Sequence, residues 1–578
     1  MGGGDDRKYG AWHGRCLCTA FRTGGARGFG RAVPAELHFS PNPDIMPGRD
    51  RAAGGPAEGR RLHHGQRRGR RNRRKSADRG GGTARAARDA SGEAPGKAKK
   101  KRPANRGGHG NAGKTRSREA GGGGRRMKGR LIRRLWGLGL ILGLLFAAGL
   151  AAGEGISPLH QVKNSYTDQK NENKSVVRLW QVETAAESVT EEVNGIARAW
   201  ADQWGPDLPS QGNASKRNSR LDVEIRYSRT GRSWLSFLIQ ARTEYHQKLK
   251  AQEMTTRTYD MATGERIRLS DIFNDEPETW EYLARGVREG LSAYWPEITP
   301  EEEKLAALCT RQALEEADFT LHGMSLVLHY PASALYEGKL TLMSVTFFYP
   351  QIRDMMTENA WAETDNLRYY KTCALTFDDG PSGTNTGKVL ASLMETGARA
   401  TFFVIGNRVK DYTHLVQREH DEGHAVASHN WHHGNVLKSS VSALRAMPEK
   451  VNRAMIQAIG IPVRYDRVPG GRYPRMIKAK VGWAYIQWSL DTYDWRGRKT
   501  SQVMSKVKRA IQDGDVILCH DIKENAPETT RQMVQYLEEQ GYMLLTVDEL
   551  FAKDGVTLEP DTVYYRCQNG DTSKRDDT

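Results

Sequence analysis

An apolar run that ends in two adjacent aspartates constrains this chain more than any other feature. The run is CALTF (residues 373–377), and Asp378, Asp379, Gly380 and Pro381 follow it directly. Glycine and proline break hydrogen-bond ladders and begin turns, so we expect a strand that ends there. The two carboxylates would lie together at a strand tip, at the mouth of a sheet or barrel. Because close like charges cannot both stay unpaired in a partly dry site, the pair predicts a cation or a shifted pKa; the alternative is an exposed turn with two solvated acids.

A second motif, about fifty residues downstream, brings imidazoles together in the segment SHNWHHG (residues 428–434). His429 and His433 are four residues apart, so on a helix or a tight turn they share one face. Neutral imidazoles at this spacing suit Zn²⁺ or a similar divalent ion. His432 could replace His433 only if the segment is not helical. The alternative is a chance cluster of surface histidines.

Three further polar segments follow in order. They are RVPGG (residues 467–471), DTYDW (residues 491–495) and VILCHD (residues 516–521), the last an apolar strand that ends in a histidine. Each is weak by itself. Five such segments in series within one domain length are hard to obtain by chance.

On these motifs, residues 371–556 resemble the polysaccharide deacetylase domain (NodB homology, carbohydrate esterase family 4). The family's ordered motifs are TFDDGP, H-[S/T]-x-x-H, R-x-P-[Y/G], D-x-x-D-W and L-x-H. The resemblance implies an α/β fold, a distorted (β/α) barrel of the NodB type, with its site at the carboxyl ends of the strands. The chain departs from the pattern at Asn430, where Ser or Thr is usual, and at Gly470, where many members have Tyr.

The resemblance implies a metal site made of Asp379, His429 and His433. These ligands would leave positions open for water and for the acetamide oxygen. Zn²⁺ is the first choice of ion, with Co²⁺ or Mn²⁺ as alternatives.

The same resemblance assigns catalytic roles. Asp378 would be the general base that takes a proton from the attacking water, and His520 would protonate the leaving amine as general acid. Arg467 would pair with Asp378. Asp494, or Asp491 as second choice, would orient His520 and keep it protonated.

The remaining expected site residues contact the acetyl group. The backbone N–H of Gly470 would help to hold the oxyanion. Leu518 and Trp495 would line a small apolar slot for the acetyl methyl group. Cys519, next to His520, also suggests a nucleophile, but strand alternation should point it away from the histidine face.

Residues 135–153 form an uncharged 19-residue run that follows a basic segment beginning at Met127. This layout is typical of a signal sequence or of a signal anchor with the C-terminal bulk outside the cell. The run is long enough to span a bilayer. We therefore expect residues 127–153 to direct the chain to a bacterial cell membrane as a single-pass protein, or to secretion if the signal is cleaved.

Residues 1–126 are a Gly/Arg-rich head without hydrophobic periodicity. They hold 31 Lys and Arg against 10 Asp and Glu, a net charge of +21, so residues 127–578 carry 18 − 21 = −3. The composition predicts disorder. A polybasic tail could bind nucleic acid or anionic lipid, but no aromatic residues interleave its densest basic stretch, so we expect no nucleic acid partner. The preferred interpretation is that translation begins at Met127.

Between these segments and the barrel we expect a linker (residues 154–175) and a separate α+β module (residues 176–366). Strands are predicted at residues 221–227 and 234–239, helices at 278–293 and 300–316, and a hairpin at 319–330. The segment YDMATGERIRLSDIF (residues 259–273) resembles the extracellular module of some cell-wall deacetylases and of lysozyme-sensing anti-sigma factors. That resemblance implies a lysozyme-like protein as partner; the alternative is a spacer. Residues 557–578 are expected to be a polar tail.

Together these patterns predict a metal-dependent N-deacetylase of peptidoglycan or another N-acetylated glycan such as a chitin-type oligomer. Three alternatives remain open: a non-catalytic glycan or lysozyme sensor, an esterase or amidase on another acylated substrate, and a nucleic-acid-binding protein that acts through the basic head.

Overall fold

The computed structural model describes residues 155–170, 175–206, 208, 219–434 and 436–574. The basic head and the apolar segment of residues 135–153 lie outside these ranges. Across the ranges that are described, no helix is both long and apolar enough to cross a membrane.

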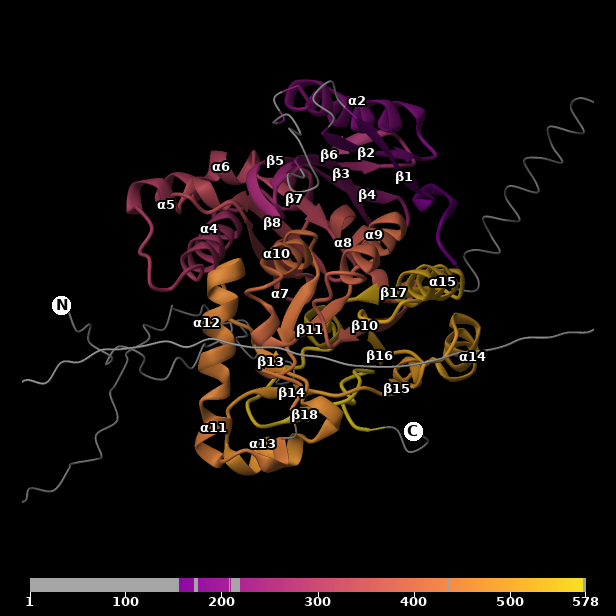
Figure 1. The fold of residues 1–578 in the computed structure, drawn as a ribbon. Coiled ribbons are helices and arrows are strands. Elements are labelled where there is room, and N and C mark those ends of the chain that lie inside the picture. Colours follow the sequence, from indigo (N-terminus) through magenta and orange to yellow (C-terminus); the bar gives the residue numbers. More distant parts are fainter. Residues whose placement is uncertain (1–154, 171–174, 207, 209–218, 435, 575–578) are drawn as a thin grey trace, which may run out of the picture. The chain divides into compact units, whose positions relative to one another are not determined.

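The chain first builds a six-stranded sheet in the described part of the module, in the order β1-β2-β3-β4-β5-β6 (Figure 1). All neighbours are antiparallel except β2 and β3. Helix α2 packs on the apolar face. The elements are β1 (Lys163–Lys170), β2 (Val176–Glu183), α2 (Glu187–Trp204), β3 (Ser219–Thr230), β4 (Trp234–Tyr245), β5 (Lys248–Asp260) and β6 (Glu265–Ile267).

Strand β1 corrects the predicted boundary at residue 176, because it lies in the segment expected to be a linker. Its sequence, KNSYTDQK, is almost entirely polar and exposed, and only Asn164 is buried. A strand whose two faces are both polar gives no alternation to detect. The module therefore begins at least as early as Lys163.

The second half of the module has a hydrophobic core of its own, formed by short helices around a three-stranded sheet, β7-β8-β9. The predicted hairpin and the first predicted helix are present, and the second predicted helix is divided into α5 and α6. The elements are α3 (Leu269–Ile272), α4 (Pro277–Ser292), α5 (Glu302–Leu308), α6 (Arg311–Glu315), β7 (Asp318–Leu321), β8 (Ser325–Pro331), β9 (Leu342–Phe348), α7 (Tyr349–Ile352) and α8 (Glu358–Thr364).

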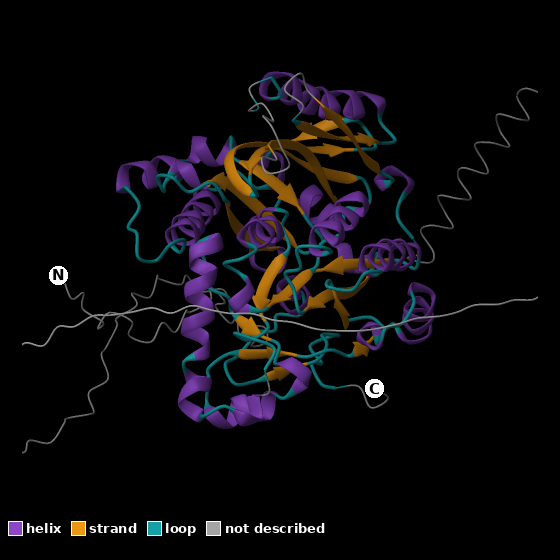
Figure 2. Ribbon diagram, viewed as in Figure 1, coloured by secondary structure: helices purple, strands orange, loops and turns teal. Residues whose placement is uncertain are grey.

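The deacetylase region is a curled parallel sheet (Figures 1 and 2). In the described residues it has nine strands in the order β15-β16-β10-β11-β12-β13-β14-β18, with β17 also paired to β10. Each ladder within it is parallel. The strands are β10 (Lys371–Asp378), β11 (Thr401–Val404), β12 (Ala425–Ser428), β13 (Tyr465–Asp466), β14 (Ala484–Ile486), β15 (Leu490–Asp491), β16 (Asp515–His520), β17 (Tyr542–Leu545) and β18 (Val563–Tyr564).

Helices cover the outside of this sheet, and Figure 1 shows α9, α14 and α15 along one flank. Alternation places Phe377 and Cys519 in the outer core beneath the helices, whereas Ala374 and Val516 face an inner core. The helices are α9 (Thr386–Thr396), α10 (Thr413–Asp421), α11 (Val441–Arg445), α12 (Met447–Ile459), α13 (Tyr473–Ala479), α14 (Thr500–Ala510), α15 (Ala526–Glu539) and α16 (Val547–Ala552).

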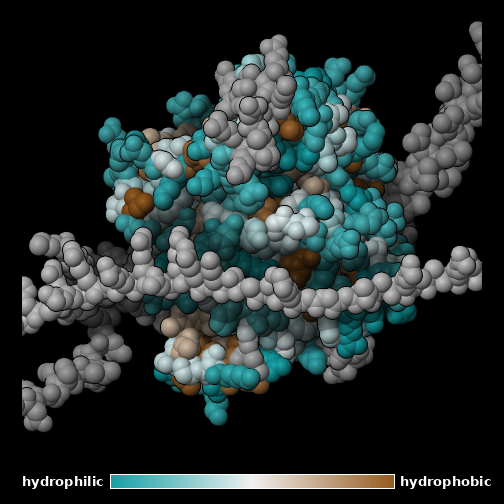
Figure 3. Space-filling model, in the orientation of Figure 1, coloured by the Kyte–Doolittle hydropathy of each residue, from teal (hydrophilic) through white to brown (hydrophobic). Residues whose placement is uncertain are grey.

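The polar face of β3 is buried, which corrects the expectation of a separate module. Arg226 donates to the carbonyl oxygen of Asp421 at 2.7 Å, and Glu224 lies 3.8 Å from Arg418. Both partners, Asp421 and Arg418, belong to α10 in the deacetylase region. Alternation of apolar and polar residues predicted β3 correctly, but charged partners replace water on its polar face. On the face drawn in Figure 3 the outer surface is mainly hydrophilic, with hydrophobic residues in small groups.

The predicted polar tail is wrong for residues 563–568, because these residues complete the sheet. Strand β18 pairs in parallel with β14, and Arg566 forms a β-bridge with Asp515. Tyr564 and Cys567 are buried. A strand of two residues is too short to carry a periodic signal.

Candidate active site

Strands β10 and β16 end side by side and bring the first two site residues together. In their parallel ladder Asp378 is the register partner of His520. Both side chains are largely buried. Strand β10 ends at Asp378, two residues before Gly380, and the ends of β10 and β16 place a carboxylate and an imidazole at the same edge of the sheet.

The chain turns sharply after β10 at Asp379, whose φ of 75° is uncommon for a residue with a side chain. Gly380 is required here, because a Cβ would meet the carboxylate oxygens of Asp521 at 2.5 and 2.8 Å. The turn is also held by Arg408, which donates to the carbonyl oxygen of Asp379 at 2.8 Å. Strained backbone of this kind is commonly found at functional sites.

Asp379, His429 and His433 converge to form a candidate metal site. Asp379 Oδ1 lies 3.4 Å from Nε2 of each histidine, and one ligand atom from each of the three residues lies within 4.8 Å of the others. The segment after β12 is a turn and not a helix, yet it places His433 and not His432 beside Asp379. His433 is 55% exposed in its side chain, so the site is open to solvent on that side.

The hydrogen bonds of these residues fit a bound cation. His429 donates from Nδ1 to the carbonyl oxygen of Arg467 at 2.6 Å, and a carbonyl can only accept. With Nδ1 used in this way, Nε2 faces Asp379 Oδ1, which is buried and has no hydrogen-bond partner among the described residues. A neutral imidazole nitrogen and a carboxylate oxygen placed in this way can share a cation, and a backbone carbonyl that accepts from the other ring nitrogen is typical of metal-binding histidines.

The pKa shifts of these residues also fit a bound cation. Burial opposes ionisation of Asp379, but its contact with His429 and the nearby charges of His520 and His433 outweigh that effect and lower its pKa to about 2. Burial lowers the pKa of His429, but the carboxylates of Asp378 and Asp379 raise it above its ordinary value overall. The site is thus an electronegative pocket that favours cations.

Arg467 is completely buried and fixes Asp378. Its Nη1 lies 2.9 Å from Asp378 Oδ1 and 2.7 Å from the hydroxyl oxygen of Thr376. Its remaining donors bind the carbonyl oxygens of Ile486 and Gln487, each at 3.0 Å. With its donors satisfied, this buried charge avoids the desolvation penalty of an unpaired ion. The other oxygen of Asp378, Oδ2, lies 3.9 Å from His429 Nε2, beside the candidate metal site.

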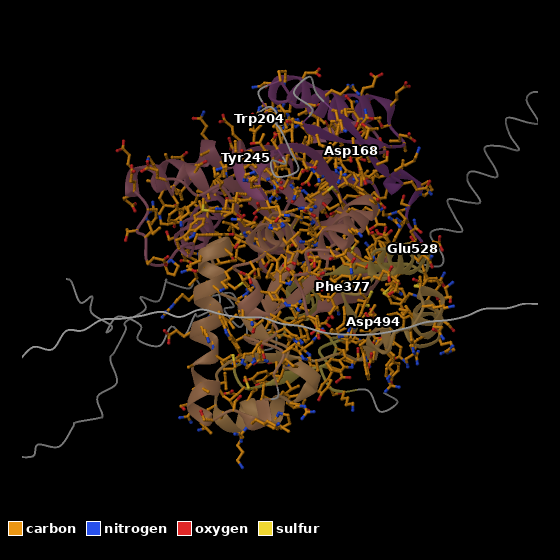
Figure 4. The ribbon with its side chains drawn as sticks, in the orientation of Figure 1. Asp168, Trp204, Tyr245, Phe377, Asp494 and Glu528 are labelled. Carbon is orange, nitrogen blue, oxygen red and sulfur yellow. The ribbon has the colours of Figure 1, made fainter. Side chains whose placement is uncertain are left out.

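Asp494, not Asp491, contacts His520 (Asp494 is labelled in Figure 4). It belongs to a short 3₁₀ turn, η8 (Asp494–Arg496), which is separated from β15 by Thr492 and Tyr493. Asp491 instead accepts from the backbone N–H of Tyr493 and from the indole N–H of Trp495. Burial lowers the pKa of His520, but the hydrogen bond and charge of Asp494 raise it overall.

The three residues expected to contact the acetyl group differ in their burial and position. Leu518 is buried on β16, two residues before His520 and hence on the same face. Trp495 is 45% exposed, so it lies at the surface beside the site and not in an enclosed slot. Gly470 and Gly471 have φ values of 65° and 67°, a pair of left-handed residues that favours glycine at both positions.

Sequence reasoning missed Asp466, which supports the candidate metal site from β13. Its Oδ1 accepts from the backbone N–H of Asn430 at 3.0 Å, and its Oδ2 lies 3.3 Å from the Asn430 side-chain nitrogen. Asn430 has a φ of 63°, a conformation that Asn tolerates better than Ser or Thr. Burial raises the pKa of Asp466 to about 6. The available signal was its position directly before Arg467.

The cysteines within the described residues are free thiols. Cys519 points away from His520 and contacts Thr492 at 3.8 Å, as strand alternation predicts. Burial raises the pKa of its thiol well above the ordinary value, which argues against a nucleophile.

The site thus combines an Asp–His–His set with a buried Asp–Arg pair and an Asp–His pair at one edge of a parallel sheet. This combination is that of a metal-dependent hydrolase. The sequence profile of the polysaccharide deacetylase family matches residues 368–485. A peptidoglycan-N-acetylglucosamine deacetylase of Bacillus cereus is 34% identical over 191 residues, which cover 31% of this chain and 69% of that protein. The chain belongs to the polysaccharide deacetylase family.

Two other proteins are similar to parts of this chain. The peptidoglycan-N-acetylglucosamine deacetylase PgdA of Listeria monocytogenes is 28% identical over 319 residues, 55% of this chain and 68% of that protein. That length exceeds the deacetylase region, so the similarity includes part of the preceding module. The solved structure of the peptidoglycan deacetylase PdaC from Bacillus subtilis has 31% sequence identity and a TM-score of 0.30, covering 31% of this chain and 90% of that one.

Proposed function

We propose that this protein removes N-acetyl groups from the amino sugars of peptidoglycan, with chitin-type oligomers as a second substrate. The observation that carries the proposal is the Asp379–His429–His433 set, flanked by a carboxylate and an imidazole that each have a dedicated partner. The names of the Bacillus cereus and Listeria monocytogenes relatives support peptidoglycan as the polymer.

Asp379, His429 and His433 would hold a divalent cation, for which Zn²⁺ is the first choice because imidazole and carboxylate are ordinary zinc ligands. When bound, this ion would polarise the acetyl carbonyl and make water a stronger acid. The remaining chemistry belongs to the side chains of this chain.

Asp378 acts as the general base. Its Oδ1 is held by Arg467, which leaves Oδ2 beside the candidate metal site to take a proton from the attacking water. The water oxygen then bonds to the acetyl carbon. The backbone N–H of Gly470 donates to the oxyanion that forms.

His520 completes the reaction as general acid. Its Nδ1 is engaged by Asp494, so Nε2 is the nitrogen that can give a proton to the leaving amine. The carbon–nitrogen bond breaks, and the products are acetate and a free amine on the sugar. Leu518 and Trp495 contact the acetyl and sugar groups at the edge of the site.

The cellular setting follows from segments outside the described residues. The apolar run of residues 135–153 would anchor the chain in a bacterial membrane, or act as a cleaved signal, and place the deacetylase outside the cell. The module before the deacetylase would then hold it toward the wall or bind a lysozyme-like protein.

The proposal is tested by measuring acetate release from peptidoglycan, from chitin oligomers and from acetylated xylan. Each substrate is tried with added Zn²⁺ and with a chelator, beside the Asp378→Asn and His429→Ala variants. Release from an amino-sugar polymer that needs the metal and both side chains supports the proposal. Faster release from acetylated xylan would favour an esterase, and no release at all would favour a sensor.

A further inference from the structure

Three cations surround the ring of Tyr493, in the loop that carries Asp494. The guanidinium carbons of Arg496 and Arg498 lie 4.8 and 4.9 Å from the ring centroid, and Nζ of Lys506 lies 5.7 Å from it. Arg496 also lies 4.6 Å from the ring of Trp495. We call Arg496, Arg498 and Lys506 the Tyr493 cationic cluster.

No member of this cluster forms an ion pair in the part of the chain that the structure describes. The two carboxylates of the same loop have other partners, since Asp494 binds His520 and Asp491 accepts from Tyr493 and Trp495. Arginines of the deacetylase region that do have acidic partners include Arg399, Arg418, Arg453, Arg464 and Arg531.

The side chains of this cluster are held in place by contacts with one ring and are not a run of separately solvated charges. Tyr493 has a φ of 56°, which is uncommon for an aromatic residue, and its ring is held between elements: the loop after β15 and helix α14, which supplies Lys506. Cation–π contacts hold the three positive charges close together. Like charges held together without a counter-charge raise the local potential and attract anions.

The cluster also borders the candidate active site. Asp494 and Arg496 belong to the same 3₁₀ turn, and the Asp494 carboxylate binds both the ring and the backbone N–H of His520. A group bound by the cluster would thus belong to the same polymer strand as the acetamide whose nitrogen His520 would protonate.

We propose that the Tyr493 cationic cluster binds carboxylates of the substrate and makes the enzyme prefer an acidic amino-sugar glycan to a neutral one. In peptidoglycan, every second sugar carries a lactyl carboxylate or a peptide attached to it, whereas a chitin oligomer is uncharged. The guanidinium fork of arginine matches a carboxylate in geometry and charge. This inference rests on the proposed function and specifies the class of substrate.

The test compares three substrates with the full-length protein: N-acetylglucosamine oligomers, peptidoglycan strands stripped of peptides, and peptide-bearing strands. The variant is Arg496→Gln/Arg498→Gln/Lys506→Gln. The measured quantity is the ratio of kcat/KM on each acidic strand to that on the neutral oligomer. We expect the ratio to fall on the order of tenfold in the variant, and to fall with added salt in the wild type but much less in the variant.

The matched control is Arg198→Gln/Lys248→Gln/Lys250→Gln, which removes the same charge from exposed positions of the module and should leave the ratio unchanged. The Arg496→Lys/Arg498→Lys variant keeps both positive charges, so it should retain most of the preference for acidic strands. It also serves to check that the loop tolerates substitution at these positions. If kcat/KM of the variant falls as much on the neutral oligomer as on the acidic strands, the inference is overturned while the proposed function stands. No acetate release by the wild type from any of the three would instead reject the proposed function. A loss confined to peptide-bearing strands would assign the cluster to peptide carboxylates, and a loss on both acidic strands to the lactyl group.

Discussion

Asp494 holds His520 through two hydrogen bonds, from the imidazole Nδ1 to Oδ1 at 2.8 Å and from the backbone N–H to Oδ2 at 2.7 Å. The two bonds fix both the ring and the strand end from which it projects. They also favour the protonated ring, so the pKa of His520 is raised although burial by itself would lower it.

Replacing Asp494 by Asn should therefore move the pH profile. A general acid must be protonated to act, so activity is present below its pKa and is lost as pH rises through it. Because Asp494 raises the pKa of His520, Asp494→Asn should shift the alkaline limb of kcat to lower pH and reduce kcat by roughly 10–10² at neutral pH. Asp491→Asn is the control, since Asp491 does not contact His520, and it should leave the limb in place. An alkaline limb that does not move in Asp494→Asn would remove His520 from the role of acid.

Removing one of the three candidate ligands should abolish metal retention. His429→Ala and Asp379→Asn should each lower both the metal content of the purified protein and the rate of acetate release, whereas His432→Ala should keep both. Metal content can be measured by elemental analysis after dialysis, independently of activity. Full retention of metal by His429→Ala would place the ion elsewhere.

Asp466 should support metal binding from behind the candidate ligands, through Asn430 and through its charge near His429. Its carboxylate holds the left-handed Asn430 between the two histidines, so Asp466→Ala should weaken metal binding by roughly 10–100-fold, the range usual for groups behind the ligands. The measurement is a competition titration against a chelator, with circular dichroism to confirm the fold. An affinity equal to that of the wild type would make Asp466 a purely structural residue.

These residues illustrate what the sequence could predict. Asp378, Asp379, His429 and His520 stand at the ends of apolar runs or in a tight turn, and parallel strands must bring their ends to one edge. Asp466 was missed because it is not one of the candidate ligands and bonds Asn430 beside them. Trp495 was misplaced because a motif gives the position of a residue in the chain and not its exposure.

The module was predicted less well for a different reason. The sequence predicted β3 as a strand, but not that its polar residues, such as Glu224 and Arg226, are buried against α10. Alternation identifies a strand but does not reveal whether water or another charged surface covers its polar side.

Glu549 offers a test of that interface. It accepts from the hydroxyl of Ser325 in the module at 2.7 Å and pairs with Arg399 of the deacetylase. Its side chain is 2% exposed, so removing it leaves a largely buried cation without a partner. Glu549→Ala should lower the free energy of unfolding by about 3–5 kcal/mol. The control is Glu449→Ala, whose exposed pair with Arg453 should contribute no more than about 1 kcal/mol. Similar losses in the two variants, measured by chemical denaturation, would contradict a buried ion-pair interface.

The last strand connects the C-terminal residues to Asp378 through a series of hydrogen bonds. The backbone N–H groups of Tyr485 and Gln487 donate to the carbonyl oxygens of Thr562 and Tyr564 at 2.8 and 2.7 Å. The carbonyl oxygen of Gln487 in turn accepts from Arg467, which holds Asp378.

A chain that ends after Leu558 should therefore lose activity as well as stability. It loses the buried side chain of Tyr564, which should lower the free energy of unfolding by about 3 kcal/mol or more. It also frees the strand that positions Arg467, so kcat/KM should fall on the order of tenfold even at temperatures where the protein remains folded. The control is a chain that ends after Lys574, which retains β18 and its bridges. If the shorter chain loses stability but keeps full kcat/KM below its Tm, then β18 stabilises the sheet without positioning Arg467, and Asp378 is held by the remaining contacts of the barrel.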